Sequence, residues 1–258
     1  LPLCQPDTTY ASCIFTWNAK RRNGLPPDII IGGSGIDLKA ELSPEIEHIM
    51  PDYSLYPDVN FSLGFTSRGC PRKCPWCIVR EKEGNIISWA SIYEFWYQRH
   101  KKIVLLDNNL LASPNWREVF SELFTIDVEV DFNQGLDIRL VDDEVAFYLG
   151  KVNARKLRFA FDHLSYEPSV RQGIDLLLKR GISPSKLSFY VLVGFDGDDT
   201  ALERMKLLSS YKVDVYPMIY KGHDGREPKL PTKLTETIFW RGGRGNLKKF
   251  LRVAGRLP

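Results

Sequence analysis

The chain of 258 residues is poor in metal-binding side chains: it has five cysteines and four histidines, and no cysteine follows Cys77. A structural zinc site needs four ligands, usually in closely spaced pairs. Such a site would have to include Cys4, Cys13 or a distant histidine, so zinc is the weaker alternative. A disulfide framework is not expected either, because three of the five cysteines lie close together and no secretory signal is visible.

Long apolar stretches are also absent. No segment approaches the roughly eighteen apolar residues that a membrane-spanning helix needs, and residues 1–7 lack the positive and apolar regions of a signal peptide. With 43% hydrophobic and 26% charged residues, the composition is typical of a globular protein with a sizeable core. We therefore expect no association with membranes and a reducing, cytoplasmic location.

Basic residues are concentrated at the carboxyl end of the chain. Residues 221–258 contain ten Lys or Arg and three acidic residues, whereas the net charge of the whole chain is only +3. Phe239, Trp240 and Phe250 are interleaved with these charges. A basic segment with aromatic side chains can bind nucleic acid, and a solvated helical surface is the alternative interpretation.

The most specific motif is Cys70-Pro-Arg-Lys-Cys74-Pro-Trp-Cys77, which directly follows a strand-like segment. Three thiolates at this spacing can bind three irons of a [4Fe–4S] cluster and leave the fourth iron without a protein ligand. Ordinary iron–sulfur electron carriers use four cysteines for each cluster. An open iron therefore favours catalysis, and the alternative is a non-catalytic iron–sulfur protein whose cluster is structural and which could bind nucleic acid.

Short apolar runs alternate with helical stretches through the middle of the chain. The predicted strands are Phe61–Thr66, Ile103–Leu106, Val128–Phe132, Leu157–Phe161, Leu187–Val193 and Val213–Met218. The predicted helices are Ser88–Arg99, Pro114–Phe124, Asp142–Leu149, Pro168–Arg180 and Asp199–Ser210. This alternation is typical of a parallel sheet covered by helices. It fits an incomplete version of the eight-stranded α/β barrel, and by itself also an ordinary doubly wound sheet.

The cysteine spacing, with an aromatic residue just before the last cysteine, resembles the signature of the radical S-adenosylmethionine enzymes. The resemblance covers about residues 60–220 and implies an α/β fold, a partial (β/α)6 three-quarter TIM barrel. It implies that Cys70, Cys74 and Cys77 ligate a [4Fe–4S] cluster and that S-adenosylmethionine chelates the open iron. An electron donor such as flavodoxin or ferredoxin would reduce the cluster, and S-adenosylmethionine would be cleaved to a 5′-deoxyadenosyl radical that abstracts hydrogen from a substrate.

The resemblance also suggests which residues contact S-adenosylmethionine. Trp76 occupies the family's aromatic position, which packs near the adenine. Asp107, Asn108 and Asn109 stand where the family often has Gly-Gly-Glu, which accepts hydrogen bonds from the ammonium group. We expect Asp107 or Asn109 to take that role, and a turn or cap function is the alternative for the asparagines.

Further candidates follow the next three predicted strands. Gln134 could face the substrate, and Asp137 and Arg139 could form an ion pair that shapes the loop. Asp162 resembles the family's ribose-binding position, since vicinal hydroxyls favour a carboxylate acceptor. Gly194 would allow the flat adenine ring to approach the backbone closely.

Residues 1–58 are predicted to form a small α/β extension. Tyr10–Trp17 and Asp28–Gly35 are two expected strands, and the glycines after the second predict a tight turn. The region resembles the last part of the cobalamin-binding domain that precedes the barrel in many radical S-adenosylmethionine proteins. The cobalamin-ligating Asp-x-His-x-x-Gly is absent, so we expect a Rossmann-like remnant without cobalamin.

The predicted organisation is therefore this remnant at 1–58, the barrel at 59–220 and a basic extension at 221–258. The lack of cysteines after Cys77 argues against relatives with auxiliary clusters in a C-terminal domain. The substrate is left open among nucleic acids or nucleotides, peptides and small metabolites.

Overall fold

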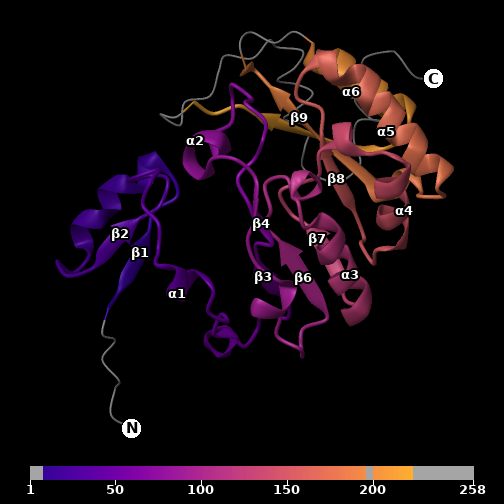
Figure 1. Ribbon diagram of the computed structural model, residues 1–258. Coiled ribbons are helices and arrows are strands. Elements are labelled where there is room, and N and C mark those ends of the chain that lie inside the picture. Colours follow the sequence, from indigo (N-terminus) through magenta and orange to yellow (C-terminus); the bar gives the residue numbers. More distant parts are fainter. Residues whose placement is uncertain (1–7, 196–199, 223–258) are drawn as a thin grey trace.

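Six parallel strands form the centre of the chain in the computed structural model, which describes residues 8–195 and 200–222 (Figure 1). Three parts of the sequence interpretation lie outside the described residues: Cys4, which a zinc site could have used, Asp199 at the start of a predicted helix, and the basic extension from residue 223 onward. Among the described helices, none is long and apolar enough to cross a membrane.

The strands pair as two parallel sheets in chain order. The first sheet contains β3 (Ser62–Gly64), β6 (Lys102–Leu105) and β7 (Glu129–Phe132). The second contains β8 (Leu157–Ala160), β9 (Leu187–Val193) and β10 (Asp214–Ile219). A parallel bridge between Leu136 and Phe159 joins the two sheets. All six predicted strands are thus confirmed within a mixed α/β fold, and the described strands form no closed barrel.

Four helices connect these strands: α3 (Trp116–Ile126), α4 (Asp143–Lys151), α5 (Glu167–Lys179) and α6 (Ala201–Ser210). Each agrees with a predicted helix to within a few residues. The helix α4 begins where the Asp142 carboxylate accepts a hydrogen bond from the amide of Val145, as an N-cap residue does. After α5, Gly181 adopts a left-handed conformation (φ 82°) and the chain turns into β9.

The predicted helix Ser88–Arg99 is wrong. Ser88 instead belongs to β5 (Ile87–Ser88), which pairs antiparallel with β4 (Ser67–Arg68), and only one 3₁₀ turn, η3 (Ile92–Glu94), forms. The Glu94 and Glu122 carboxylates accept hydrogen bonds from the first amides of this turn, those of Ser91 and Ile92. The turn ends soon afterwards because the Tyr97 amide donates to the Ser62 hydroxyl, not to a helical carbonyl. Hydrogen bonds from backbone amides to side chains thus take the place of the helical backbone hydrogen bonds that the apolar pattern predicts.

Burial alternates along the strands, so the two faces of the sheets differ. The face packed against the helices is apolar and contains Ile103, Leu105, Val130, Phe132, Phe159, Phe189 and Val191, all 3% exposed or less. The opposite face is half-buried and polar: the Asp131 carboxylate of β7 pairs with Lys102 of β6 at 3.1 Å and with Arg158 of β8. The helices therefore stabilise one face and leave polar side chains on the other.

Residues 8–58 form a small extension that lies beside α2 (Val79–Glu83) (Figure 1). As predicted, two strands pair there, β1 (Tyr10–Ser12) and β2 (Ile30–Gly32), and they run parallel. The predicted turn follows at Gly33, which has φ 96° and whose added Cβ would lie 2.6 Å from the Cys13 carbonyl. The 3₁₀ helix η1 (Thr16–Gly24) joins β1 to β2, and the short turns α1 (Pro44–Glu47) and η2 (Tyr53–Leu55) lie between β2 and the parallel sheets.

Hydrogen bonds of Lys39 and Tyr53 are among the contacts that attach the extension to the rest of the chain. Lys39 donates to the Glu81 carbonyl of α2. The Tyr53 hydroxyl donates to the Phe95 carbonyl at 2.8 Å and accepts from the Leu63 amide of β3 at 3.0 Å. The extension therefore connects directly to the first strand of the parallel sheets.

Gly173 of α5 permits the closest approach between a helix and the loop that follows β7. A Cβ at this position would lie 2.7 Å from Ile138 Cδ1 and 3.1 Å from the Ile138 carbonyl. We predict that Gly173→Ala lowers the free energy of unfolding by about 1–3 kcal/mol, the usual cost of overpacking. Urea denaturation would measure this change.

Gly150→Ala is the matched control, since a Cβ on Gly150 of α4 would have its nearest contact at 3.9 Å. This variant should be neutral or stabilising by up to about 1 kcal/mol, because alanine has the higher helix propensity. Equal stabilisation of both variants would contradict the packing argument.

Candidate functional site

The three cysteines of the motif lie on one loop, residues 69–86, which joins β4 to β5. Cys70 and Cys74 are half-buried, and Cys77 is exposed. The Cys77 amide donates to the Cys74 carbonyl at 3.0 Å, so these two residues share a tight turn. The short helix α2 follows immediately and returns the chain to β5. We call residues 69–86 the cysteine loop.

Asp107 fixes the start of the cysteine loop. It follows β6, is buried, and its Oδ1 atom accepts four hydrogen bonds. The donors are the Thr66 amide and hydroxyl (3.1 and 2.8 Å) and the Ser67 amide and hydroxyl (2.5 and 2.6 Å). Burial raises the pKa of Asp107, although these hydrogen bonds act in the opposite direction. The carboxylate therefore holds the carboxyl end of β6 against the chain that leads into the cysteines.

Glu83 closes the loop from its other side. Its Oε2 atom accepts from the Gly69 amide at 2.9 Å and from the Asn108 side-chain amide at 2.8 Å. The Arg68 guanidinium lies 3.4 Å from the other oxygen. Gly69 has φ 80°, and an added Cβ would lie 2.1 Å from the Asn85 carbonyl, so only glycine fits there. Asn108 was predicted to contact S-adenosylmethionine. In the structure its side chain binds Glu83 and so helps to hold the cysteine loop in place.

Asn109 joins the end of β6 to the first cysteine. Its Nδ2 atom lies 3.5 Å from Cys70 Sγ and 3.3 Å from Asp137 Oδ2. The residue is only 3% exposed, and its Oδ1 atom has no hydrogen-bond partner among the described residues. Asp107 Oδ2 is a second buried acceptor of this kind. A buried acceptor without a donor costs about 1–3 kcal/mol, so these two acceptors, of which Asn109 lies beside a thiol, mark places where a ligand could donate hydrogen bonds.

Asp137 connects the cysteine loop to the turn after β7. Its side chain is 6% exposed and accepts from Arg139 Nε at 2.7 Å and from Arg72 Nε at 2.9 Å. Burial would raise the pKa of Asp137, but the hydrogen bonds and charges of the two arginines outweigh it and lower that pKa. The predicted pair of Asp137 and Arg139 is confirmed. Arg72, which lies between the first two cysteines, is a third member of this cluster.

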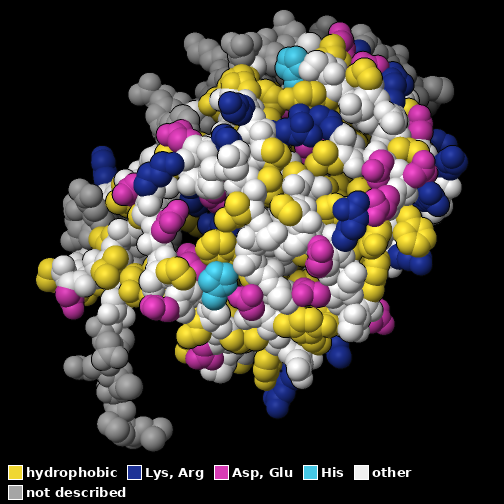
Figure 2. All heavy atoms as spheres, in the orientation of Figure 1, with side chains coloured by type: hydrophobic (Ala, Val, Ile, Leu, Met, Phe, Trp, Pro, Cys, Tyr) yellow, Lys and Arg dark blue, Asp and Glu magenta, His cyan; other side chains and the backbone are white. Residues whose placement is uncertain are grey.

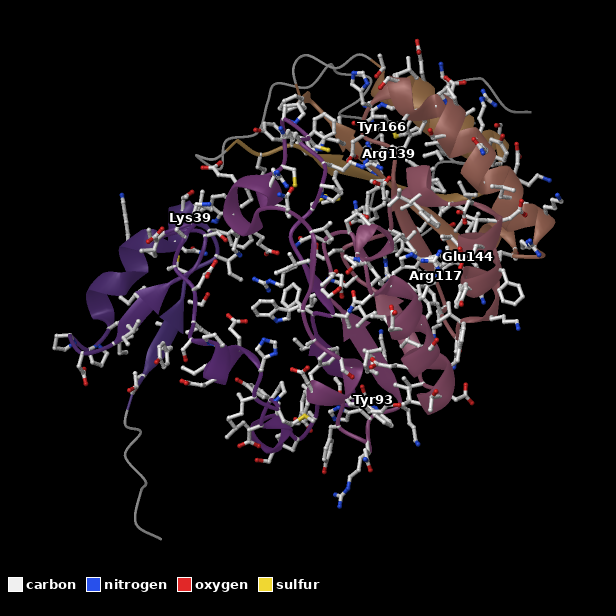
Figure 3. All side chains as sticks on the ribbon, viewed as in Figure 1. Lys39, Tyr93, Arg117, Arg139, Glu144 and Tyr166 are labelled. Carbon is white, nitrogen blue, oxygen red and sulfur yellow. The ribbon has the colours of Figure 1, made fainter. Side chains whose placement is uncertain are left out.

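The cluster of Asp137 with two arginines leaves positive charge next to the thiols. The Arg139 guanidinium also lies over the Tyr166 ring at 4.4 Å, and Figure 3 shows both side chains near the carboxyl ends of the strands. Figure 2, in the same orientation, shows Lys and Arg side chains grouped in this region. Burial raises the pKa of the Cys74 thiol, whereas the charge of Arg139 acts to lower it. Burial raises the pKa of the Cys77 thiol as well.

Asp162 follows β8 and approaches the same thiols from the second sheet. Its Oδ1 atom accepts from the Leu192 amide of β9 at 3.1 Å. Burial raises the pKa of Asp162, while the Leu192 amide, the charges of Arg204 and Arg139 and a hydrogen bond from the Trp76 side chain oppose that shift. Asp162 therefore lies within hydrogen-bonding range of the predicted adenine-binding residue.

Aromatic side chains line the end of the second sheet. The Trp76 ring meets the Phe195 ring edge-on at a centroid distance of 5.4 Å, and Phe195 meets Tyr220 at 5.0 Å. Between β9 and Phe195, Gly194 has φ 83°, a conformation that glycine adopts readily. These half-buried rings could contact a flat, apolar ligand group.

The structure thus groups most of the predicted site residues around the cysteine loop, namely Cys70, Cys74, Cys77, Trp76, Asp107, Asn108, Asn109 and Asp162. Gln134 lies in an exposed turn, and no described contact connects it to this group. Sequence reasoning missed the supporting role of Glu83. It lies on α2, a short helix that the apolar pattern does not predict.

The cysteine loop carries the thiols that could hold a metal group. Within residues 8–195 and 200–222, no three His, Cys, Asp or Glu side chains converge as ligands of one metal ion would. A [4Fe–4S] cluster has a different requirement, because each thiolate binds a different iron atom. No protein-family profile matches the chain, and no curated protein is significantly similar to it.

Asp137→Asn should destabilise the protein by about 1–3 kcal/mol at neutral pH, the usual worth of hydrogen bonds to charged groups. The pKa of Asp137 is lowered on folding, so its stabilisation is present above the unfolded value of about 3.9 and is lost as the pH falls through the folded value. The difference between the variant and the natural protein should therefore shrink as the pH falls below about 4. Denaturation at neutral and acidic pH would measure it.

Asp143→Asn is the control for this measurement, because Asp143 forms an exposed ion pair with Arg180. Exposed pairs contribute little to stability, so no measurable change is expected. Equal denaturation midpoints for the Asp137 variant and the natural protein would contradict the structural role given to Asp137.

Proposed function

We propose that the chain is a radical S-adenosylmethionine enzyme. In this proposal one [4Fe–4S] cluster on Cys70, Cys74 and Cys77 cleaves S-adenosylmethionine reductively, and the resulting radical abstracts hydrogen from a substrate. The observation that carries it is the environment of Asn109. A buried amide beside the Cys70 thiol, at the carboxyl end of a parallel strand, has an acceptor oxygen with no donor among the described residues.

The arrangement of the strands supports this proposal. We propose that β3, β6, β7, β8, β9 and β10 form one open, partial (β/α)6 barrel whose halves meet at the bridge between Leu136 and Phe159. In such barrels, ligands bind at the carboxyl ends of the strands. The cysteine loop, Asn109, Asp137 and Asp162 all follow carboxyl ends of these strands, in agreement with that rule.

The residues of the site fit the two groups in the proposal. The three thiols would bind irons, and a bound, reduced cluster would supply the electron that cleaves S-adenosylmethionine to methionine and a 5′-deoxyadenosyl radical. Asn109 Oδ1 and Asp107 Oδ2 would accept hydrogen bonds from the ammonium group. Arg72 and Arg139 would balance the negative charge of the thiolates. Asp137 keeps both arginines in place.

The nucleoside would lie toward the second sheet. Trp76 would pack against the adenine, Gly194 would allow the ring to approach β9, and Asp162 would accept hydrogen bonds from the ribose hydroxyls. The substrate would then occupy the polar face of the sheets, which carries Asp131 and Arg158. The reaction also requires an electron donor such as flavodoxin or ferredoxin and a reducing compartment such as the cytoplasm.

The test is anaerobic reconstitution of the cluster, followed by dithionite reduction in the presence of S-adenosylmethionine and chromatography for 5′-deoxyadenosine. We expect 5′-deoxyadenosine to form, and Cys74→Ala to abolish it. Cys13→Ala is the matched control, because Cys13 lies outside the motif and its thiol donates to the Phe15 carbonyl. A brown, cluster-loaded protein that yields no 5′-deoxyadenosine would instead indicate a structural cluster.

A second prediction concerns Asn109 itself. Asn109→Ala should weaken the binding of S-adenosylmethionine to the oxidised, cluster-loaded protein about tenfold or more, the usual worth of one hydrogen bond to a charged group. Isothermal titration calorimetry would give the dissociation constant. Asn153→Ala, at an exposed position after α4, is the control and should bind normally. Unchanged binding by the Asn109 variant would show that the ammonium group lies elsewhere.

A further inference from the structure

Arg204 of α6 is fully buried, and it is the one buried Lys or Arg side chain among the described residues. Figure 1 shows α6 packed along the second sheet, near the ends of β8 and β9. Removing a guanidinium from water costs several kcal/mol unless its donors are well satisfied. The groups that accept hydrogen bonds from Arg204 should therefore explain why this side chain can be buried.

The guanidinium binds two strands at once. Its Nη1 atom donates to the Phe161 carbonyl at 2.7 Å, and its Nη2 atom donates to the Leu192 carbonyl at 3.0 Å. Phe161 directly follows β8, and Leu192 lies near the end of β9. The planar fork of arginine reaches both carbonyls from two nitrogen atoms in one fixed geometry, whereas the three donors of a lysine ammonium share a single nitrogen on a flexible chain.

These contacts replace a regular hydrogen bond of the sheet. The last paired residues of β8 and β9 are Ala160 and Tyr190, and the Phe161 amide still donates to the Tyr190 carbonyl at 2.8 Å. In a parallel pair, the Phe161 carbonyl would next accept from the Leu192 amide. Here that carbonyl accepts from Arg204, and the Leu192 amide donates to Asp162 Oδ1 at 3.1 Å.

The exchange of partners connects Arg204 to Asp162. Because the guanidinium occupies the Phe161 carbonyl, the Leu192 amide is available to hold the Asp162 carboxylate. The positive charge of Arg204 also lies close enough to act on that carboxylate. Without the guanidinium, the Leu192 amide could return to the Phe161 carbonyl, and Asp162 would lose its backbone donor.

We propose that Arg204 is a positioning residue, which interrupts the pairing of β8 and β9 so that Asp162 is held toward the ribose of a bound nucleoside. The inference rests on the proposed function, since it assigns the ribose to Asp162. It goes beyond that function, because the recognition of the ribose hydroxyls would depend on Arg204, a side chain that would contact neither the cluster nor S-adenosylmethionine.

The experiment compares S-adenosylmethionine with its 2′-deoxy and 3′-deoxy analogues. Their dissociation constants are measured on the oxidised, cluster-loaded chain, which does not cleave them. The natural protein should prefer the parent compound over at least one analogue by about tenfold or more, as expected for a hydrogen bond to a carboxylate. In Arg204→Met and in Asp162→Asn this preference should fall to within about twofold, and the double variant should lose nothing more.

A ratio of affinities separates positioning from stability, because partial unfolding weakens the binding of all three compounds equally. Thermal unfolding is followed alongside. If Arg204→Met does not fold, Arg204→Lys takes its place and should lose most of the preference, since lysine lacks the fixed fork that holds both carbonyls. Arg155→Met, at a residue whose side chain is 84% exposed, is the matched control and should keep the full preference.

The outcomes distinguish the inference from the function on which it rests. If the natural protein binds no S-adenosylmethionine, the proposed function fails and the inference with it. If the natural protein binds but ignores the hydroxyls, or if the Arg204 variants keep a preference that Asp162→Asn removes, only the inference is overturned. Loss of the preference for the parent compound in both the Arg204 and the Asp162 variants, with no further loss in the double variant, supports the inference.

Discussion

The carboxylate of Asp107 connects the parallel sheet to the cysteine loop. One of its oxygens accepts four hydrogen bonds from Thr66 and Ser67, the residues that lead into the loop. The rest of the site depends on this connection. It fixes the position of Cys70 relative to β6. Asn109, two residues after Asp107, therefore lies against the Cys70 thiol. The donors of Thr66 and Ser67 favour the carboxylate form and so oppose the burial that raises the pKa of Asp107.

The second requirement of the site is a balance of charge. Three thiolates on one short loop would repel one another, so nearby cations are needed if all three are to lose their protons. Arg72 and Arg139 provide them, and both are held by the buried carboxylate of Asp137. One acidic residue thus serves two purposes: it joins the cysteine loop to the turn after β7, and it keeps positive charge at a place where free arginines would turn toward water.

The sequence predicted the elements with clear periodicity and failed where side chains replaced backbone hydrogen bonds. All six strands and four helices were found because buried parallel strands and amphipathic helices have characteristic apolar patterns. The region Ser88–Arg99 has a similar pattern, yet carboxylates from Glu94 and Glu122 cap a single turn there, and a capping partner as distant as Glu122 cannot be read from local sequence. The cysteines could be recognised by their spacing, and so could the polar residues that end each strand. Glu83 and Arg204 could not, because their importance arises from contacts between segments that are distant in the chain.

The division of the strands into two sheets has a further consequence. Asn109, which contacts Cys70, follows a strand of the first sheet, whereas Asp162 and Gly194 follow strands of the second, and the described backbone pairing between the sheets is the bridge of Leu136 and Phe159. A ligand that contacts both groups must bring the two halves to one relative position. By thermodynamic linkage, the free energy of binding such a ligand also opposes separation of the halves. In this fold the ligand would therefore add its own contacts to those of the apolar core that the two sheets already share.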